Sequence, residues 1–307
     1  MKKACPAAAR SRAKAGRLAG ALTAAIISLT TALSAQSALT DVGGVLERAG
    51  KRVSEYFARA QSLVCLEKVA LQRLGLTWSP EGMARRVESE LRLSWDPTPE
   101  NPTPKEAKTV RQVLRVNGGK PRKKDYDNCT TPEQNTEEEQ PLSILLPQQR
   151  QDYTFAIAGR ETIDGREALV IAFKEVRKPK VDVSMVENNE DCISFDIEGG
   201  MRGKIWIDVE TQDVLRLDRS LSGLVEIPLP RKATLHAGSP MSWTMERWDS
   251  SIRFKRVSFD DPQETLVLPI SSTTLQVTRG SGQPRLRTST EYIAYRRFLT
   301  GGRIIPQ

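Results

Sequence analysis

One segment of the chain, residues 41–62, carries its apolar side chains at helical spacing. Charged residues fill the positions between them, so the segment is predicted to form one long amphipathic helix. Gly43, Gly44 and Gly50 weaken this helix locally. The apolar stripe, which indicates only that the helix packs on another element, contains Val42, Val45, Leu46, Ala49, Val53, Tyr56, Phe57 and Ala60.

Beyond the helix, apolar positions alternate with polar ones, which is typical of strands with one buried face. Residues 86–95 show this alternation most clearly, and residues 63–74 and 109–116 are predicted to be two further strands. Residues 96–108 and 118–141 are expected to be surface loops, because the first stretch is rich in proline and the second in charge.

The second half of the chain is predicted to be a series of hairpins. A short apolar stretch, Leu142–Leu146, precedes them and is expected to form a single helical turn. Asp164-Gly165 is a tight-turn pair, and it connects a strand at Tyr153–Ile157 to a strand at 168–173.

A second hairpin, Gly203–Asp218, has two aliphatic rows. Ile205 and Ile207 alternate with polar residues on its first strand, and Leu215 and Leu217 do so on its second. The two rows are expected to pair on one buried face of the sheet.

Trp206 then lies on the charged side of this hairpin and is not expected to line a cavity. Further strands are predicted at 251–259, 264–268, 273–278 and 286–297. Together these elements make about ten antiparallel strands of meander type plus one long helix. No fixed repeat and no long linker separates a second domain, so residues 36–307 are expected to form a single, mainly β domain.

The first 35 or so residues have the order of a secretory signal peptide. A basic segment without acidic residues comes first, an apolar run from Leu18 to Leu33 follows, and small residues close it. The run is shorter than the ~20 residues that span a bilayer, so we expect cleavage, with the mature chain beginning between Ala35 and Ala38. Cys5 lies in the basic segment and no cysteine stands near the cleavage region, which excludes a lipoprotein signal.

The basic balance of the whole chain comes mostly from this segment. The chain has 46 Lys and Arg against 38 Asp and Glu, a net charge of +8. Residues 1–35 hold six of the basic residues and none of the acidic ones, which leaves 40 against 38, or +2, for the remainder. A nearly neutral protein gives no electrostatic reason to expect nucleic acid.

Three cysteines remain after export, and they are Cys65, Cys129 and Cys192. An oxidising compartment permits one disulfide with one thiol left over. We predict a disulfide between Cys129 and Cys192, because both lie in polar sequence beside a strand, and a buried thiol at Cys65, which lies in an apolar strand. A bridge between Cys65 and Cys129 remains the alternative. No CxxC pair is present, so a metal site is not expected.

The motifs of common enzymes are missing from the sequence. The only histidine, His236, lies in a predicted loop, and no Gly-x-Ser-x-Gly elbow, HExxH, phosphate-binding glycine loop or dinucleotide fingerprint occurs. Glu88 and Glu90 are expected on the exposed side of a strand rather than as a pair of catalytic carboxylates. We therefore expect no catalytic activity and no cofactor.

The hairpin Gly203–Asp218, with the sequence GKIWIDVETQDVLRLD, resembles the central hairpin of the LolA/LolB/LppX superfamily of periplasmic lipoprotein carriers and lipid-binding proteins. The order of features around it is similar. A signal and a helix come first, strands with a turn at Val116-Asn117-Gly118 follow, and Phe254–Phe259 and an apolar-proline step at Leu266–Pro269 come after the hairpin. The likeness covers most of residues 40–298 in outline.

The resemblance implies a curved, unclosed antiparallel half-barrel with the helix across its concave face and acyl chains bound between the two. The pattern of the residues agrees, because a sheet that curves incompletely around an amphipathic helix leaves an apolar cavity. The candidate cavity residues are Tyr56, Phe57, Leu91, Leu93, Trp95, Phe155, Ile157, Ile171, Phe173, Ile205, Ile207, Leu215 and Leu217.

The first functional hypothesis is a periplasmic or secreted protein, without a stable membrane anchor, that carries or senses a lipid or lipoprotein acyl chain. The second is an interaction module of the cell envelope that uses the same scaffold without a ligand and binds envelope proteins. A third, a hydrolase, requires a close pair of buried carboxylates. The competing interpretation of the apolar rows is that they close on each other as an ordinary dry core.

Overall fold

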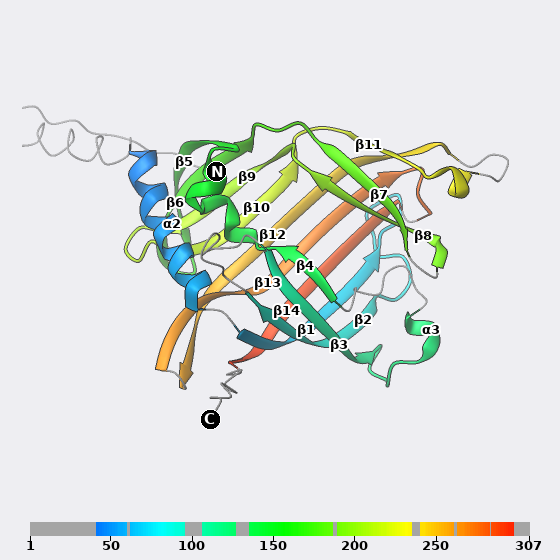
Figure 1. Ribbon diagram of the computed structural model, residues 1–307, viewed down its shortest axis with the longest axis horizontal. Helices are drawn as coiled ribbons and strands as arrows, with labels where there is room; N and C mark the ends of the chain where they lie inside the picture. The colour runs from blue at the N-terminus through cyan, green and yellow to red at the C-terminus, as the bar shows by residue number, and fades with distance from the viewer. Residues whose placement is uncertain are drawn as a thin grey trace, which may run out of the picture. The chain divides into compact units, whose positions relative to one another are not determined.

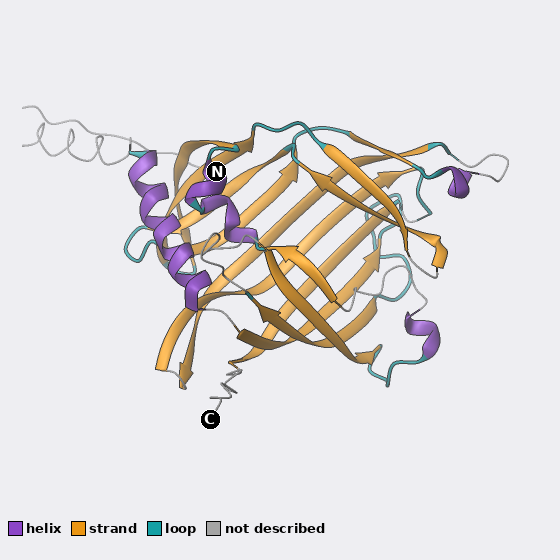
Figure 2. Ribbon diagram, viewed as in Figure 1, coloured by secondary structure: helices purple, strands orange, loops and turns teal. Residues whose placement is uncertain are grey.

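The computed structural model describes residues 41–59, 62–95, 106–126, 135–186, 189–234, 240–260, 263–282 and 284–297. The chain divides into two units, Met1–Asp41 and Val42–Gln307. The second unit contains the helices and strands described below and is mainly β (Figures 1 and 2).

The strands are β1 (Ser62–Arg73), β2 (Arg85–Ser94), β3 (Glu106–Val116), β4 (Asn135–Glu139), β5 (Tyr153–Ile163), β6 (Arg166–Glu175), β7 (Lys180–Val186), β8 (Asn189–Glu198), β9 (Met201–Asp208), β10 (Val214–Leu221), β11 (Val225–Pro228), β12 (Ser242–Asp260), β13 (Gln263–Arg279) and β14 (Arg285–Arg297). The helical elements are α2 (Val42–Arg59), α3 (Lys123–Tyr126), η1 (Pro141–Leu145), α4 (Pro147–Arg150) and η2 (Arg231–Thr234).

One antiparallel sheet of 12 strands dominates the fold. Its order is β4-β3-β2-β1-β14-β13-β12-β10-β9-β6-β5, and β11 pairs with β12. The strands β4 and β5 follow each other in the chain but form opposite edges, and no described residue pairs one with the other. The sheet is therefore not closed. A large open antiparallel sheet with one long helix is what the sequence predicts, and the structure confirms it.

The chain between the two edges forms η1 and α4, which lie against α2 and β5. The apolar residues Leu142, Ile144, Leu145 and Leu146 of this segment are buried. α2 crosses η1 so closely that a Cβ atom on Gly50 would stand 2.5 Å from the carbonyl oxygen of Leu145. The glycine that weakens the helix is therefore the residue that lets the two backbones approach.

The strand register defines two faces of the sheet, because residues directly opposite each other on neighbouring strands share a face. The face that carries Trp95 is called the inner face. The centroid of the Trp95 ring lies 5.6 Å from that of Phe57 on α2. Ile171 of β6, Ile205 of β9 and Leu217 of β10 lie opposite one another on this face. In Figure 1, α2 and the β7–β8 hairpin lie over the inner face, and the other face is called the outer face.

The charged segment 118–141 is not all loop, contrary to the prediction. It contains α3 and the strand β4, which pairs with β3 so that Glu106 lies opposite Glu139. A glutamate-rich sequence has low strand propensity, and the edge of β3 supplies a pairing that local sequence does not reveal. The expected loop at 96–108 is also shorter, because β3 begins at Glu106, and residues 96–105 lie outside the described residues.

The two strands predicted at 264–268 and 273–278 are one strand, β13. The register against β12 shifts where Phe254 lies opposite Pro269. A bulge is one of the few places where a sheet accepts proline, so the proline that breaks the pattern in the sequence does not end the strand.

Candidate functional site

The predicted cavity residues lie together on the inner face, with one exception. Phe155 lies opposite Phe173, Ile157 lies opposite Ile171, and Ile171 continues to Ile205 and Leu217 on the next strands. Nearer the β4 edge of the sheet, Leu91 and Leu93 of β2 lie on the same face as Trp95.

Leu215 is the exception, and it lies on the outer face. The register of β10 shifts between Val214 and Arg216, and such a bulge turns the extra residue to the other side. Val214 takes the place opposite Ile207, while Leu215 packs in a separate cluster with Trp206. The expected pairing of Leu215 and Leu217 on one face is therefore wrong.

Trp206 lies on the outer face of the sheet, as the alternation predicts. It is nevertheless buried, although its neighbours on that face are charged. Its side chain is 4% exposed. The guanidinium of Arg216 stacks 4.7 Å from the centroid of the Trp206 ring. The Nε1 of Trp206 donates a hydrogen bond to Glu161 at 2.9 Å. Long charged side chains can cover an aromatic ring while their heads stay in water.

The end of the inner face beneath α2 is closely packed. Tyr56, Phe57 and Trp95 form an aromatic cluster with ring centroids 5.1 to 6.0 Å apart. Across the inner face as a whole, the predicted wall residues that are buried are Leu91, Leu93, Ile171, Phe173, Ile205, Ile207 and Leu217. A pocket between α2, β10 and β13 has a volume of about 70 Å³, whereas sites for small molecules occupy roughly 300–1,000 Å³. This pocket therefore has room for a few waters and not for an acyl chain.

The end of the inner face beneath the β7–β8 hairpin has a second apolar cluster, whose outer members are less completely buried. β7 and β8 form their own two-stranded sheet, separate from the main one. A buried cluster of Leu221, Val225, Ile227 and Met245 lies beneath them. Around this cluster the packed apolar side chains are only partly buried, and they are Val181, Val183, Phe195, Ile197, Met201, Trp243 and Trp248.

Sequence reasoning missed this second apolar region. The signal was present, because Val181, Val183 and Met185 alternate with polar residues, as do Ile193, Phe195 and Ile197. These two short runs form β7 and β8.

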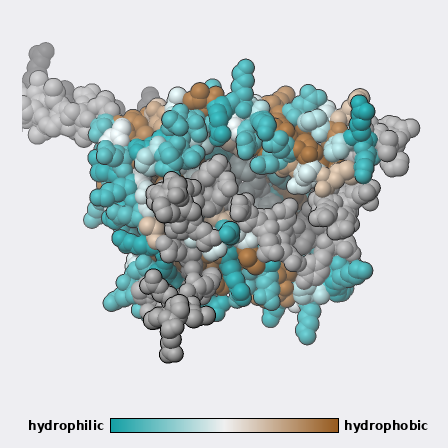
Figure 3. Space-filling view, viewed as in Figure 1, coloured by the Kyte–Doolittle hydropathy of each residue, from teal (hydrophilic) through white to brown (hydrophobic). Residues whose placement is uncertain are grey.

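Between its two apolar ends the inner face is polar. Ser272 and Thr274 of β13 lie opposite Thr290 and Thr288 of β14, and Thr274 also lies opposite Ser250 of β12. The expected cavity wall is therefore interrupted by a band of hydroxyl groups. The same side of the molecule, seen as a surface in Figure 3, carries mainly hydrophilic side chains around its margin.

The buried thiol predicted at Cys65 is confirmed, because Cys65 is a free cysteine with a side chain that is 1% exposed. Burial, and next the nearby carboxylate of Glu67, raise its pKa to about 12. Glu67 itself forms an ion pair with Arg111 at 2.9 Å. The predicted Cys129–Cys192 bridge stays a prediction, since Cys129 and the side chain of Cys192 lie outside the described residues.

We expect Cys65 to resist thiol reagents in the folded protein. In a variant with Cys129→Ser and Cys192→Ser, labelling by a disulfide reagent at pH 8 should be at least about a hundredfold slower than in denaturant, because the reactive thiolate is scarce and shielded. The time course of thiol release measures both rates. Labelling that is equally fast with and without denaturant would show that Cys65 is neither buried nor protonated.

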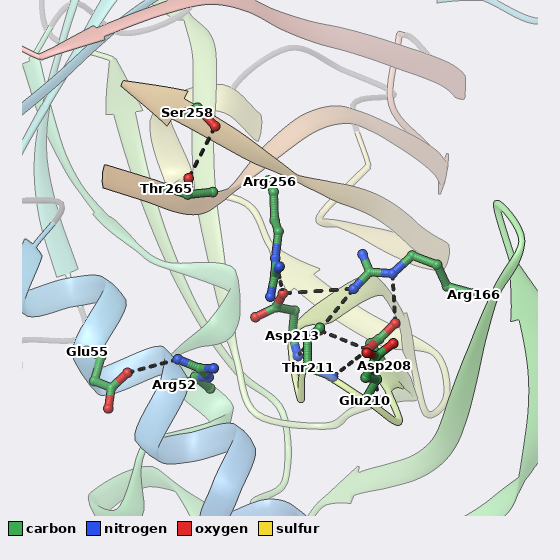
Figure 4. A network of polar contacts seen from close by, with 10 residues as sticks. All are labelled: Arg52, Glu55, Arg166, Asp208, Glu210, Thr211, Asp213, Arg256, Ser258 and Thr265. Carbon is green, nitrogen blue, oxygen red and sulfur yellow. Dashed lines mark hydrogen bonds and ion pairs between the residues drawn. The ribbon is translucent and has the colours of Figure 1, made fainter. Parts of the chain in front are cut away.

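The turn between β9 and β10 holds two buried carboxylates, Asp208 and Asp213 (Figure 4). Arg166 Nε lies 2.8 Å from Asp208 Oδ2, and Arg256 Nε donates to Asp213 Oδ2 at 2.6 Å. The other Asp208 oxygen, Oδ1, accepts hydrogen bonds from the backbone N–H of Thr211 at 2.6 Å and from its hydroxyl at 2.8 Å.

This network is the close pair of buried carboxylates that the hydrolase hypothesis requires, but Asp208 is unsuited to that chemistry. Burial by itself would raise the pKa of Asp208. The hydrogen bonds from Thr211 and the charge of Arg166 outweigh burial and hold the pKa below its usual range. A hydrolase of this kind needs a carboxylic acid with a raised pKa as the proton donor. The network instead fixes the turn on which the inner-face residues of β9 and β10 depend.

Replacing Asp208 with alanine should therefore cost stability at neutral pH. We expect a loss of about 3 kcal/mol, because Arg166 and Thr211 lose their partner. A carboxyl with a lowered pKa stabilises the fold above its unfolded pKa of about 4, and this contribution disappears as pH falls through the folded pKa. Urea unfolding at pH 7 and at pH 3 should show the difference between wild type and variant shrinking at pH 3.

Asp182→Ala is the matched control, because Asp182 forms an exposed ion pair with Lys180 on β7. Its effect should stay below about 1 kcal/mol at both pH values. Equal effects of the two substitutions at pH 7 would contradict the structural importance of the network.

Three further sequence expectations lie outside the described residues. They are the signal peptide at residues 1–35, the mature N-terminus between Ala35 and Ala38, and the position of His236. Among the helices that the structure describes, none is long and apolar enough to cross a membrane.

Comparisons with known proteins give likenesses of structure alone. No family model matches the chain, and no curated protein matches it. A DUF1329 family protein from Desulfovibrio piger aligns with a TM-score of 0.42 and 8% identity, over 84% of this chain and 94% of that chain. An outer membrane lipoprotein-sorting protein domain from Vibrio parahaemolyticus aligns with a TM-score of 0.35 and 13% identity, over 83% and 92%. A LolA superfamily protein from Nitrosomonas europaea aligns with a TM-score of 0.31 and 8% identity, over 86% and 96%.

These neighbours include the superfamily that the hairpin Gly203–Asp218 resembles. With TM-scores below 0.5, their functions are not transferred to this chain.

Proposed function

We propose that the protein binds the acyl chain of a lipid or lipoprotein on the inner face of the open sheet, as a carrier or sensor in the periplasm. The observation that carries this proposal is the group of partly buried apolar side chains beneath the β7–β8 hairpin. A dry core would close such side chains off from water. A group of apolar residues left partly accessible is instead typical of binding sites.

The chemistry of this region suits a flexible apolar ligand. Met201 is unbranched and polarisable, so it adapts to chains of different shape. Trp243 and Trp248 offer large apolar surfaces at low entropic cost. The hairpin that covers them is a two-stranded unit of its own, which is marginally stable without the surface beneath it. A ligand can therefore be admitted by a displacement of the hairpin that leaves the main sheet intact.

The predicted wall residues beneath α2 remain part of the proposal. A long acyl chain bound beneath the β7–β8 hairpin would extend to them along the inner face. The pocket beside α2 is only about 70 Å³. Binding at that end requires α2 or the apolar turn Leu142–Leu146 to move aside. Export through the signal peptide, the lack of a stable membrane anchor and the absence of catalysis belong to the same proposal.

A second function has one observation in its favour. The closed packing beneath α2 and the hydroxyl band across the inner face fit an interaction module of the cell envelope that uses the scaffold without a ligand. The two functions differ in one measurable property, because only a carrier retains lipid.

Native mass spectrometry of the protein purified from the periplasm, together with titration of a fluorescent fatty acid, tests the proposal. We expect a bound lipid mass and saturable uptake. Met201→Asn should weaken uptake at least about fivefold without unfolding the protein, because a partly buried amide can stay hydrated. Met83→Asn is the matched control, since Met83 is 98% exposed. No lipid mass, no saturable uptake, or equal uptake by the two variants would sink the acyl-binding site.

A further inference from the structure

The outer face of the sheet carries a groove of about 720 Å³. Its lining residues on β12 and β13 include Ser251 and Thr273, which lie opposite each other. Each is the chain neighbour of an inner-face residue, Ser250 and Thr274 respectively, so the groove opens on the side of the sheet away from α2. Small side chains such as that of Ala172 line the bottom of the groove and make it deeper.

Six basic residues line this groove. Arg219 stacks on Trp248 and Arg247 pairs with Asp249. The other four cations are Lys174, Arg202, Lys204 and Arg287. All four residues are exposed. Lys174 lies directly opposite Arg202 on the neighbouring strand. Like charges in that position destabilise a sheet, so the fold maintains a local repulsion that an anion would relieve.

The acidic residues of the groove do not supply that anion. Asp218 forms an ion pair with Arg216 at 2.6 Å, and Asp249 forms one with Arg247. Within the part of the chain that the structure describes, none of the four cations forms an ion pair. The groove therefore has a surplus of positive charge although the exported chain as a whole is nearly neutral.

We propose that this outer groove binds an acidic, extended segment of a partner protein. The groove crosses six strands, from β6 to β14, which at about 4.8 Å per strand is roughly 24 Å. An extended peptide of about seven residues covers that length at ~3.3 Å per residue. Carboxylates spaced along such a segment meet cations from β6, β9 and β14 in turn.

A lipid surface fits the groove less well than a peptide. Membrane-surface binding combines basic residues with large apolar side chains that insert between lipids. The apolar residues in this groove are Ala172, Phe173 and Leu275, and none of them is exposed. A hollow between cations also suits a narrow chain better than a flat bilayer.

Binding of a fluorescein-labelled deca-glutamate peptide to the full exported protein tests the proposal. We expect saturable binding that weakens with added salt, and no binding of a deca-glutamine peptide. The double variant Lys174→Gln, Arg202→Gln should lose at least about tenfold in affinity. Its melting temperature should be no lower than that of wild type, because the repulsion between the two cations is removed.

Arg115→Gln, Lys255→Gln is the matched control, since both cations are exposed, lie outside the groove and change the net charge equally. It should keep the wild-type affinity within about twofold. If the double variant fails to fold, Arg287→Gln alone should still weaken binding against Lys255→Gln alone.

Equal loss of affinity in the groove variant and in the control would overturn the groove as a site. So would binding of the protein to vesicles of phosphatidylglycerol and phosphatidylcholine that is stronger than peptide binding and is lost in the groove variant. Fatty-acid uptake should be the same in wild type and groove variant, so failure of this site and failure of the acyl-binding site are separate results.

Discussion

Gly203→Ala is expected to remove most of the stability of the protein. A Cβ atom at this position would stand 1.9 Å from the carbonyl oxygen of Asp218 and 2.8 Å from Cζ of Phe173. The first of these atoms belongs to the backbone of β10, so no side-chain rotation relieves the clash. β9 and β10 must separate where Gly203 lies opposite Arg219. We expect a loss of about 4 kcal/mol or more, at the upper end of what one added methyl group costs.

Urea unfolding followed by circular dichroism measures this loss as a shift of the midpoint. Gly223→Ala is the matched control, because no atom lies within 4 Å of a Cβ added there. Its midpoint should stay close to that of wild type or rise slightly, since alanine restricts the unfolded chain. Equal midpoints for the two variants would mean that β9 and β10 do not approach each other at Gly203 as the structure has them.

The parts of the fold that depend on local periodicity could be predicted from the sequence. The alternation of Leu91 and Leu93, and of Ile205 and Ile207, places these residues on the inner face because each lies in an uninterrupted strand. The helix at Val42–Arg59 follows from its stripe in the same way. Where local pattern and tertiary pairing agree, the pattern is sufficient.

The parts that depend on long-range pairing could not be predicted. The bulge at Leu215 inverts a face without any change of composition, since a single residue shifts the period of two. β4 exists because β3 offers an edge, and not because Asn135–Glu139 favours strand structure. The closure of the helix end by Leu142–Leu146 depends on where β4 and β5 place the two ends of that turn.

The outer groove, a proposed functional site, could not be predicted from the sequence for the same reason. Lys174 and Arg202 are separated by a hairpin in the sequence, and only the pairing of β6 with β9 brings them opposite each other. The net charge of residues 36–307, 40 basic against 38 acidic side chains, hides this surplus because the remaining charges cancel across the molecule. Charge patterning along a β chain therefore identifies a site only after the register is known.

Ile205→Asn distinguishes a closed core from an open cavity at the helix end of the inner face. Ile205 is 1% exposed and lies between Ile171 and Leu217 on the neighbouring strands. The substitution removes buried apolar contacts and leaves an amide without partners, so we expect a loss of about 3–5 kcal/mol in the free energy of unfolding. Chemical denaturation of wild type and variant measures it directly.

Ile293→Asn provides the control for the same chemical change, because Ile293 is 40% exposed on β14. Its cost should stay below about 1 kcal/mol. The variants Ile205→Asn and Met201→Asn together separate the two ends of the inner face. Ile205→Asn should lower the stability of the fold, and Met201→Asn should lower the affinity for the ligand. If Ile205→Asn instead kept wild-type stability while fatty-acid affinity dropped, water would have to reach Ile205 in the ligand-free protein. The acyl chain would then lie beneath α2, and the closed packing described above would not be the resting state.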